Sequence, residues 1–354
     1  PKGLRVISLT SNSGKSLGIW QLQIGTPSAC PHLDEALLLR SKGKPSQALE
    51  LLDKPPGLNT NKCKGRGDGV RARLLLDLDR PQEAKSFFEK AASKRRADGE
   101  LSGWVKESLA LAFITTFKLR NFAQSRATLA SVQSALEGYD EGRVHLAFAH
   151  GQLARASGDL RGALQAYSEA EEFAGKLDMG WLRYIFGNAR AEALSALGRD
   201  KEAMEIFDSM LKDSQNGLDA CGRAGLLNNT GWQRMGMRNK MPQTQWNSEN
   251  DPAPVYKEAL KLFRTRCPSQ VEDANVSVNL ALMNLQTDQL DAAEQYLEDA
   301  RKEHPNPDAY IALWMKEIKG RIALARQKNA DALAIYDDLH QVSSPMSEAR
   351  LRAT

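Results

Sequence analysis

The chain has 354 residues, enough for two or three ordinary domains or for one long repeat array. Its 48 basic and 44 acidic residues leave a net charge of only +4. So mild a balance argues against a surface built for nucleic acid or for an anionic membrane, and we expect neither as a partner. No run of about 18 apolar residues occurs, so no helix is expected to span a membrane.

Residues 1–30 form a segment ahead of the repeats. Gly14, Lys15 and Ser16 match the second half of a phosphate-binding P-loop, but Leu9 stands where the motif needs its first glycine. Two apolar stretches, 4–11 and 17–25, flank this turn, which indicates a short β-hairpin or an irregular segment that packs on the first repeat. We therefore expect no nucleotide site here.

Residues 31–345 repeat one pattern: a helix with a small residue, a turn, then a second helix with a small anchor residue. Small residues let two antiparallel helices approach closely, and a large apolar residue four positions after the anchor fills the space between hairpins. The anchors are Ala48, Ala84, Ser125, Ala163, Ala203, Ala259, Ala293 and Ala332. The large residues are Leu52, Phe88, Leu129, Tyr167, Phe207, Phe263, Leu297 and Tyr336.

A second small residue stands on the first helix, twelve positions before most anchors. These residues are Ala36, Ala72, Gly151, Ala191, Ala281 and Gly320, with Gly231 moved back by an insertion in the sixth repeat. The third repeat departs from the rule, because Phe113 occupies that position. The pattern resembles the tetratricopeptide (TPR) repeat, best in "ARASGDLRGALQAYSEA" at 154–170. We expect an all-α, TPR-like solenoid of about eight helical hairpins.

Two segments depart from the repeat. The polar insertion at 237–251 is expected to form a loop between the two helices of the sixth repeat, either a tolerated surface insertion or a functional loop. Residues 346–354 begin a further helix after Pro345. Because a solenoid needs a polar closing repeat, we expect the native chain to continue past Thr354.

The residues that could carry chemistry form no recognisable site. The four cysteines are far apart and have no zinc-site spacing, so we expect reduced, packed thiols in a cytoplasmic protein. The sequence "KGRGDG" at 64–69 is interpreted as a loop. A basic cluster is assigned to solvated connections between repeats, with an acidic partner or a nucleic-acid contact as the alternative; it comprises Lys62, Lys64, Arg66, Arg71, Arg73, Lys94, Arg95 and Arg96. We expect no catalytic residue, metal or cofactor.

Asparagines on the first helices are the candidate binding residues. Asn229 and Asn279 each stand two positions before the small residue of adjacent repeats. In TPR proteins the first helices line the concave groove, and asparagines at this position resemble those that bind the backbone of a bound peptide. An amide suits that role because it both donates and accepts hydrogen bonds. Alternatively, these amides bridge neighbouring helices. Further candidates are Asn188, Asn228, Asn275 and Trp232, while Trp181 and Trp314 are expected to pack helices.

The later repeats narrow the resemblance. "GLLNNTGW", "EDANVSVNLALMNL" and "LDAAEQYLEDAR" are similar to the TPR half of bacterial TPR–CHAT proteins, in which the array precedes a caspase-like domain. This implies a protein- or peptide-binding sensor module, with a downstream caspase-like domain of the same protein as a further partner. The alternatives are a ligand-sensing TPR module of a transcription regulator or kinase-linked protein and, in another class, an enzyme with an unrecognised Cys/His site.

Overall fold

The computed structural model describes residues 30–41, 44–53, 61–177, 179, 182–248, 250–267, 272–304 and 309–342. Every regular element in these ranges is helical, which confirms the expected all-α, TPR-like solenoid. The P-loop-like motif and the expected β-hairpin at 1–30 lie outside the described residues except for Cys30, and so does the expected helix at 346–354. No helix of the described residues is long and apolar enough to cross a membrane.

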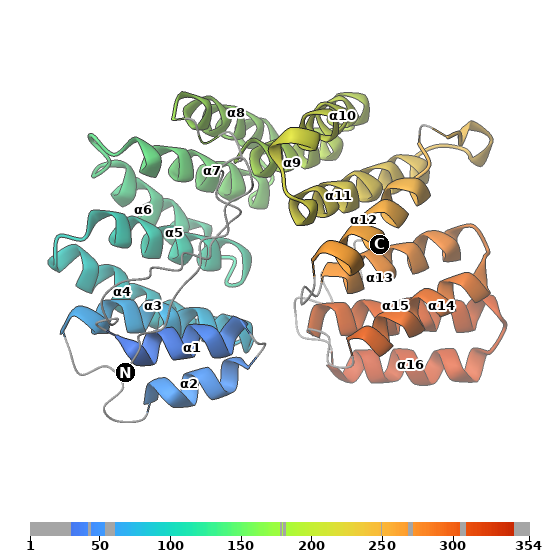
Figure 1. The fold of residues 1–354 in the computed structure, drawn as a ribbon, viewed down its shortest axis with the longest axis horizontal. Coiled ribbons are helices and arrows are strands. Elements are labelled where there is room, and N and C mark those ends of the chain that lie inside the picture. Colours follow the sequence, from blue (N-terminus) through green and yellow to red (C-terminus); the bar gives the residue numbers. More distant parts are fainter. Residues whose placement is uncertain are drawn as a thin grey trace. The chain divides into compact units, whose positions relative to one another are not determined.

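The chain divides into two compact units, residues 1–199 and 200–354. In each unit, successive helices pack as antiparallel neighbours (Figure 1). Unit 1 contains α1 (Pro31–Ser41), α2 (Pro45–Asp53), α3 (Asn61–Asp77), α4 (Pro81–Ala97), α5 (Leu101–Phe117), α6 (Phe122–Gln133), α7 (Asp140–Ala156), α8 (Leu160–Lys176) and α9 (Arg183–Ala196). Unit 2 contains α10 (Asp200–Gly217), α11 (Ala220–Asn239), the 3₁₀ helix η2 (Gln243–Gln245), α12 (Ala253–Arg266), α13 (Glu272–Gln286), α14 (Leu290–Glu303), α15 (Ala309–Ala325) and α16 (Asn329–Val342).

Within each unit, the small anchor residues lie where the paired helices contact each other, as expected. All eight anchors are at most 1% exposed. A Cβ atom on Gly151 would come within 2.4 Å of the ring of Tyr167, so only glycine fits beside this large residue. In the sixth repeat a different large residue packs on the glycine of the first helix, because Gly231 faces Tyr256 rather than Phe263. The insertion between α11 and α12 therefore changes which turn of α12 meets the small residue.

The exception at Phe113 comes from the length of a turn. The α5–α6 turn runs from Lys118 to Asn121, one residue longer than the three-residue turn between α7 and α8. The extra residue moves the small position back by one, to Ala112, which is 2% exposed and whose carbonyl accepts a hydrogen bond from Ser125. Phe113 consequently faces outward and is 45% exposed.

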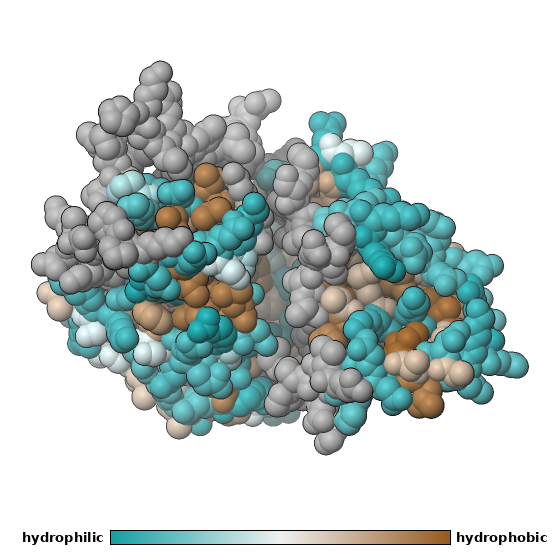
Figure 2. All heavy atoms as spheres, turned by 90° about the horizontal axis from the view of Figure 1, so that it is seen from below, coloured by the Kyte–Doolittle hydropathy of each residue, from teal (hydrophilic) through white to brown (hydrophobic). Residues whose placement is uncertain are grey.

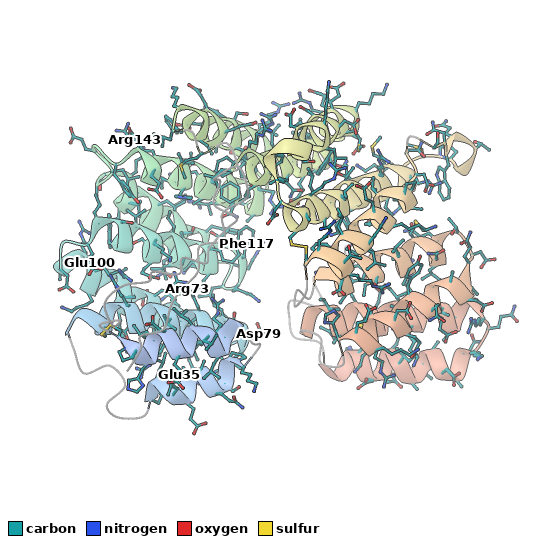
Figure 3. The ribbon with its side chains drawn as sticks, in the orientation of Figure 1. Glu35, Arg73, Asp79, Glu100, Phe117 and Arg143 are labelled. Atoms are coloured by element: carbon teal, nitrogen blue, oxygen red, sulfur yellow. A yellow bond between two sulfur atoms is a disulfide. The ribbon has the colours of Figure 1, made fainter. Side chains whose placement is uncertain are left out.

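The turns within the repeats share one backbone feature. The residue five positions before the anchor has a positive φ in six repeats. Glycine takes this position at Gly158 (φ 90°) and Gly198 (φ 76°), where it avoids the steric cost that other residues meet in the left-handed region. Asp79, Arg120, Asp288 and Gln327 hold the same position without that advantage. Figure 3 shows Asp79 and Phe117 at the end of the unit 1 helices where these turns lie.

The segment 64–69 is helical, so its interpretation as a loop is wrong. It lies in α3 together with Arg71 and Arg73, while the other members of the basic cluster belong to α3 and α4 rather than to connections between repeats. Gly69 is needed here because a Cβ atom would meet the carboxylate of Glu107 on α5 at 2.6 Å. Tertiary packing against the next repeat thus overrides the low helix propensity of three glycines.

A buried carboxylate neutralises part of the basic cluster. Glu107 is 2% exposed and lies 2.9 Å from Arg73 on α3 and 3.7 Å from Arg95 on α4. Arg95 also binds Glu100 at 2.6 Å, and Arg71 binds Asp53 at 2.9 Å. These arginines therefore join neighbouring repeats, which removes much of the argument for an acidic partner at this cluster.

The described residues of the insertion, 237–248 and 250–251, contact the end of α11. The first of them extend that helix to Asn239, and the remainder includes η2. The guanidinium of Arg238 lies 4.2 Å from the centroid of the Trp246 ring and 3.1 Å from Asp251. The Trp246 indole N–H donates to the Arg238 carbonyl at 3.2 Å. These contacts attach Trp246 and Asp251 of the insertion to Arg238 of α11.

The last hairpin keeps apolar side chains on its surface. Leu324 on α15 is 48% exposed, and Leu333 on α16 is 63% exposed. Hydrophobic atoms are visible on this part of unit 2 among mostly hydrophilic neighbours (Figure 2). A helix pair inside a solenoid would cover such residues with the next pair.

Candidate functional site

The candidate site lies in unit 2, on the surface formed by α11, α13 and α15. We call it the Asn/Trp face and define it by Asn228, Asn229, Trp232, Asn279 and Trp314. Helical geometry places Asn228 and Trp232 one turn apart on α11, while Gly231 between them faces inward against Tyr256. The α13 helix packs against both α11 and α15, so it lies between the two tryptophan-bearing helices.

Two amides of this face bind each other across the repeat boundary. The Asn279 Nδ2 on α13 donates to the Asn228 Oδ1 on α11 at 2.9 Å. One bond uses only part of the hydrogen-bonding capacity of two amides, because each has two N–H donors and two acceptor lone pairs. Both side chains are partly exposed. The pair thus bridges neighbouring helices and still presents donors and acceptors.

An aromatic pair lies on the same surface. Trp232 is 47% exposed, and its ring meets that of Trp314 edge to face, with centroids 6.4 Å apart and an interplanar angle of 86°. Trp314 is partly buried. An exposed indole that is held in place by a second indole offers a large apolar surface at a small entropic cost. Trp314, which the sequence assigns to packing, therefore contributes to the candidate site.

The other candidates are placed differently. Asn229 and Asn275 are partly exposed, and their side chains make no hydrogen bond within the described part of the chain. Asn188 lies on α9 in unit 1, where it donates to Glu192 at 2.9 Å, and Glu192 also accepts from Arg155 at 2.9 Å. Five of the six predicted residues thus lie on the adjacent helices α11 and α13, and only Asn188 lies elsewhere. Of the five, Asn228, Asn229, Asn279 and Trp232 belong to the Asn/Trp face, and Asn275 lies one turn before Asn279 on α13.

A carboxylate on α15 modifies the charge near this face. Glu317 lies one turn after Trp314, and its side chain is 12% exposed. Burial raises the pKa of Glu317, and Arg321, 3.7 Å away, opposes part of that rise. The negative charge beside the tryptophans is therefore weakened by desolvation and by the nearby guanidinium.

The expectation of reduced thiols is wrong. Cys30 pairs with Cys63, and Cys221 pairs with Cys267, and no cysteine is left free. The two pairs are separated by 33 and 46 residues, so no local spacing could reveal them. Disulfides are typical of oxidising compartments, so the expected cytoplasmic location loses the argument on which it depended. A Cys/His enzyme site likewise has no free thiol as its nucleophile.

Metal ligands are not gathered at any point of the described chain, where no group of three His, Cys, Asp or Glu side chains could hold an ion. Among the described histidines, His304 contacts a carboxylate through its Nε2 atom, that of Asp273. No cysteine thiol accompanies it.

Comparison with known proteins gives a likeness of fold. No protein-family model matches the sequence. No curated protein matches it at a significant level. Among solved structures, a Rap protein complexed with competence and sporulation factor aligns with a TM-score of 0.54 and 13% identity, over 88% of this chain and 86% of that one. The apo form of RapI aligns with a TM-score of 0.51 and 12% identity, over 87% and 84%. BtubC from P. vanneervenii is 21% identical over 69% of this chain and 92% of its own, with a TM-score of 0.46. The chain therefore has the fold of TPR-type helical repeat proteins.

Proposed function

We propose that this chain is a protein- or peptide-binding scaffold and that the Asn/Trp face is its binding surface. The observation that carries this proposal is the half-exposed Trp232, held by Trp314 beside the Asn228–Asn279 amide pair. Tryptophan is over-represented among residues that dominate binding energy. Amides can satisfy the backbone of an extended peptide, while the indoles cover one of its apolar side chains.

The likeness to Rap proteins supports the alternative of a ligand-sensing module. A Rap protein with the same fold was solved with competence and sporulation factor bound. By analogy of fold alone, a ligand-sensing TPR module of a transcription regulator or kinase-linked protein is a second candidate. The more specific proposal, the regulatory half of a CHAT protease, is supported by the sequences of the later repeats. It is tested by sequencing the source reading frame beyond Thr354 for a caspase-like domain.

The binding face can be tested without knowing the natural partner. Peptides are selected from a random display library on the wild-type chain, and their affinities are measured by fluorescence anisotropy. For Trp232→Ala we expect about a 30-fold loss, since truncating a residue that dominates an interface costs about 2 kcal/mol. Asn229→Ala combined with Asn279→Ala should also weaken binding while leaving the helical circular dichroism spectrum intact.

Leu333→Ala is the matched control, because Leu333 is an exposed apolar residue on α16 outside the face. It should leave the affinity unchanged. The face is not the binding surface if the selected peptides have the same affinity for Trp232→Ala, for the asparagine double variant and for the wild type.

A further inference from the structure

A cavity of about 450 Å³ lies in unit 1, where α7 meets the end of α6 and the middle of α8. Its volume falls within the range of roughly 300–1,000 Å³ that is typical of ligand pockets. Figure 3 places Arg143, one of its lining residues, at the end of α7 that adjoins the α6–α7 turn. The cavity is separate from the Asn/Trp face, which belongs to unit 2.

Four of the residues that line this cavity are apolar, and we call them its floor. They are Leu136, Leu146, Ala147 and Phe173, of which the first three are at most 6% exposed. Leu136 and Leu146 belong to the core between α5, α6 and α7, whereas Ala147 and Phe173 belong to the core of the next repeat. The cavity thus lies where two repeat cores meet, and it offers apolar contact to any group that enters.

The rim of the cavity carries an excess of negative charge. Glu137 lies in the α6–α7 turn and Glu169 on α8, and neither makes an ion pair within the described chain. Arg143 is the opposing charge, but Asp140 lies 3.4 Å from it and offsets it. His150 lines the cavity from α7; burial lowers the pKa of its imidazole, and Glu169 only partly opposes this, so the ring is neutral near pH 7.

One further cation lies nearby and is itself neutralised. The Lys176 Nζ is 5.7 Å from the centroid of the Phe173 ring, and Glu172 binds it at 2.7 Å. This contact shows that an ammonium group can lie against this ring. The charges of Lys176 and Glu172 cancel, so the two unpaired carboxylates still determine the sign of the rim.

We propose that this cavity binds the side chain of a lysine or arginine from a partner protein. Such a side chain has an apolar stem, which suits the floor of Leu136, Leu146 and Phe173, and a cationic head, which suits Glu137 and Glu169. An anion would meet the two carboxylates. A purely apolar group would cover them and leave them without a partner. The inference goes beyond the proposed function, because it concerns another unit and another ligand chemistry.

The test uses three blocked amino-acid amides as probes, observed by nuclear magnetic resonance at the side chains of His150 and Phe173. Nα-acetyl-arginine amide should shift both signals saturably, Nα-acetyl-norleucine amide more weakly, and Nα-acetyl-glutamate amide not at all. Free arginine serves as a fourth probe. It should bind no more tightly than the blocked amide, since a side chain within a polypeptide has no free amino or carboxyl group.

Substitution of the rim completes the test. Glu137→Gln combined with Glu169→Gln should weaken binding of the arginine amide by up to about tenfold, as expected for two exposed charge contacts. Glu205→Gln on α10 in unit 2 is the matched control and should change nothing. The proposal is overturned if the arginine amide gives no saturable shift, if the three amides bind equally, if the double variant binds as the wild type does, or if free arginine alone binds.

Discussion

Reduction of the Cys221–Cys267 disulfide should destabilise unit 2 by about 4 kcal/mol. The bond joins residues 46 positions apart and so closes a loop that spans α11, the insertion and α12. In the chain-entropy account, a loop of this length restricts the unfolded chain by about 13 cal/mol/K, or about 4 kcal/mol at 25 °C. The loss of stability should be large in this repeat, because the insertion at 237–251 replaces the short turn that joins the two helices of other repeats.

The assay compares the oxidised and the reduced wild-type chain, so no side chain is lost. Urea unfolding followed by circular dichroism should show a midpoint lower by more than about 1 M after reduction. Because reduction also breaks Cys30–Cys63, hydrogen exchange must separate the two effects, and the loss of protection that belongs to Cys221–Cys267 should appear in α11, α12 and α13. Alkylation of the unfolded chain without reductant should add no label to the four cysteines, and alkylation after reduction should label all four.

Cys30→Ser combined with Cys63→Ser is the matched control, since that disulfide spans 33 residues within unit 1. The variant should lose protection around α1–α3 and keep that of α11–α13. The reasoning is refuted if reduction leaves the urea midpoint of the wild type unchanged. It is equally refuted if the unreduced, unfolded chain takes up label at its cysteines, because the disulfides would then be absent.

Three substitutions test the packing of the repeats by urea unfolding. Gly231→Ala should destabilise the chain by about 1 kcal/mol or more, because its Cβ atom would lie 2.6 Å from the buried Tyr256 ring and overpacking outweighs the gain in helix propensity; equal stability would contradict this contact. Gln327→Gly should stabilise by about 0.5–1 kcal/mol, since φ is 60° there; Ala325→Gly, at the exposed last residue of α15, is the control and should destabilise. Glu107→Ala should cost about 3–5 kcal/mol, because it leaves Arg73 and Arg95 without their buried partner; a loss below about 1 kcal/mol would refute a buried ion pair.

The repeat register could be predicted from the sequence because it depends on local spacing. An anchor such as Ala163 and the tyrosine four residues later face one direction of a helix, whatever the rest of the chain does. The same reasoning failed at Phe113, where one extra turn residue moves the small position to Ala112. Turn length is set by a few weakly constrained residues, so an alignment of helices alone does not determine it.

The errors at 64–69 and at the cysteines have a different cause. Three glycines within five residues favour a loop on propensity, but Gly69 lies beneath Glu107, a residue 38 positions away in sequence. The Cys30–Cys63 partners are brought together only when α3 packs on the first repeat, and the Cys221–Cys267 partners only when α12 folds back on α11 across the insertion. Contacts between residues far apart in sequence decide both features, and periodicity within a helix carries no information about them.

The asparagines show how the two sequence interpretations can hold together. A bridging role was the alternative to peptide binding, and the Asn279–Asn228 bond is such a bridge. Yet a bridge fixes the orientation of both amides, and an oriented amide loses less entropy when a ligand binds. Asn229 makes no such bond within the described residues, so the donors and acceptors of its amide are all available to a ligand. The bridge and the Trp232–Trp314 contact would therefore set the position of the face, and Asn229 would adapt to what binds there.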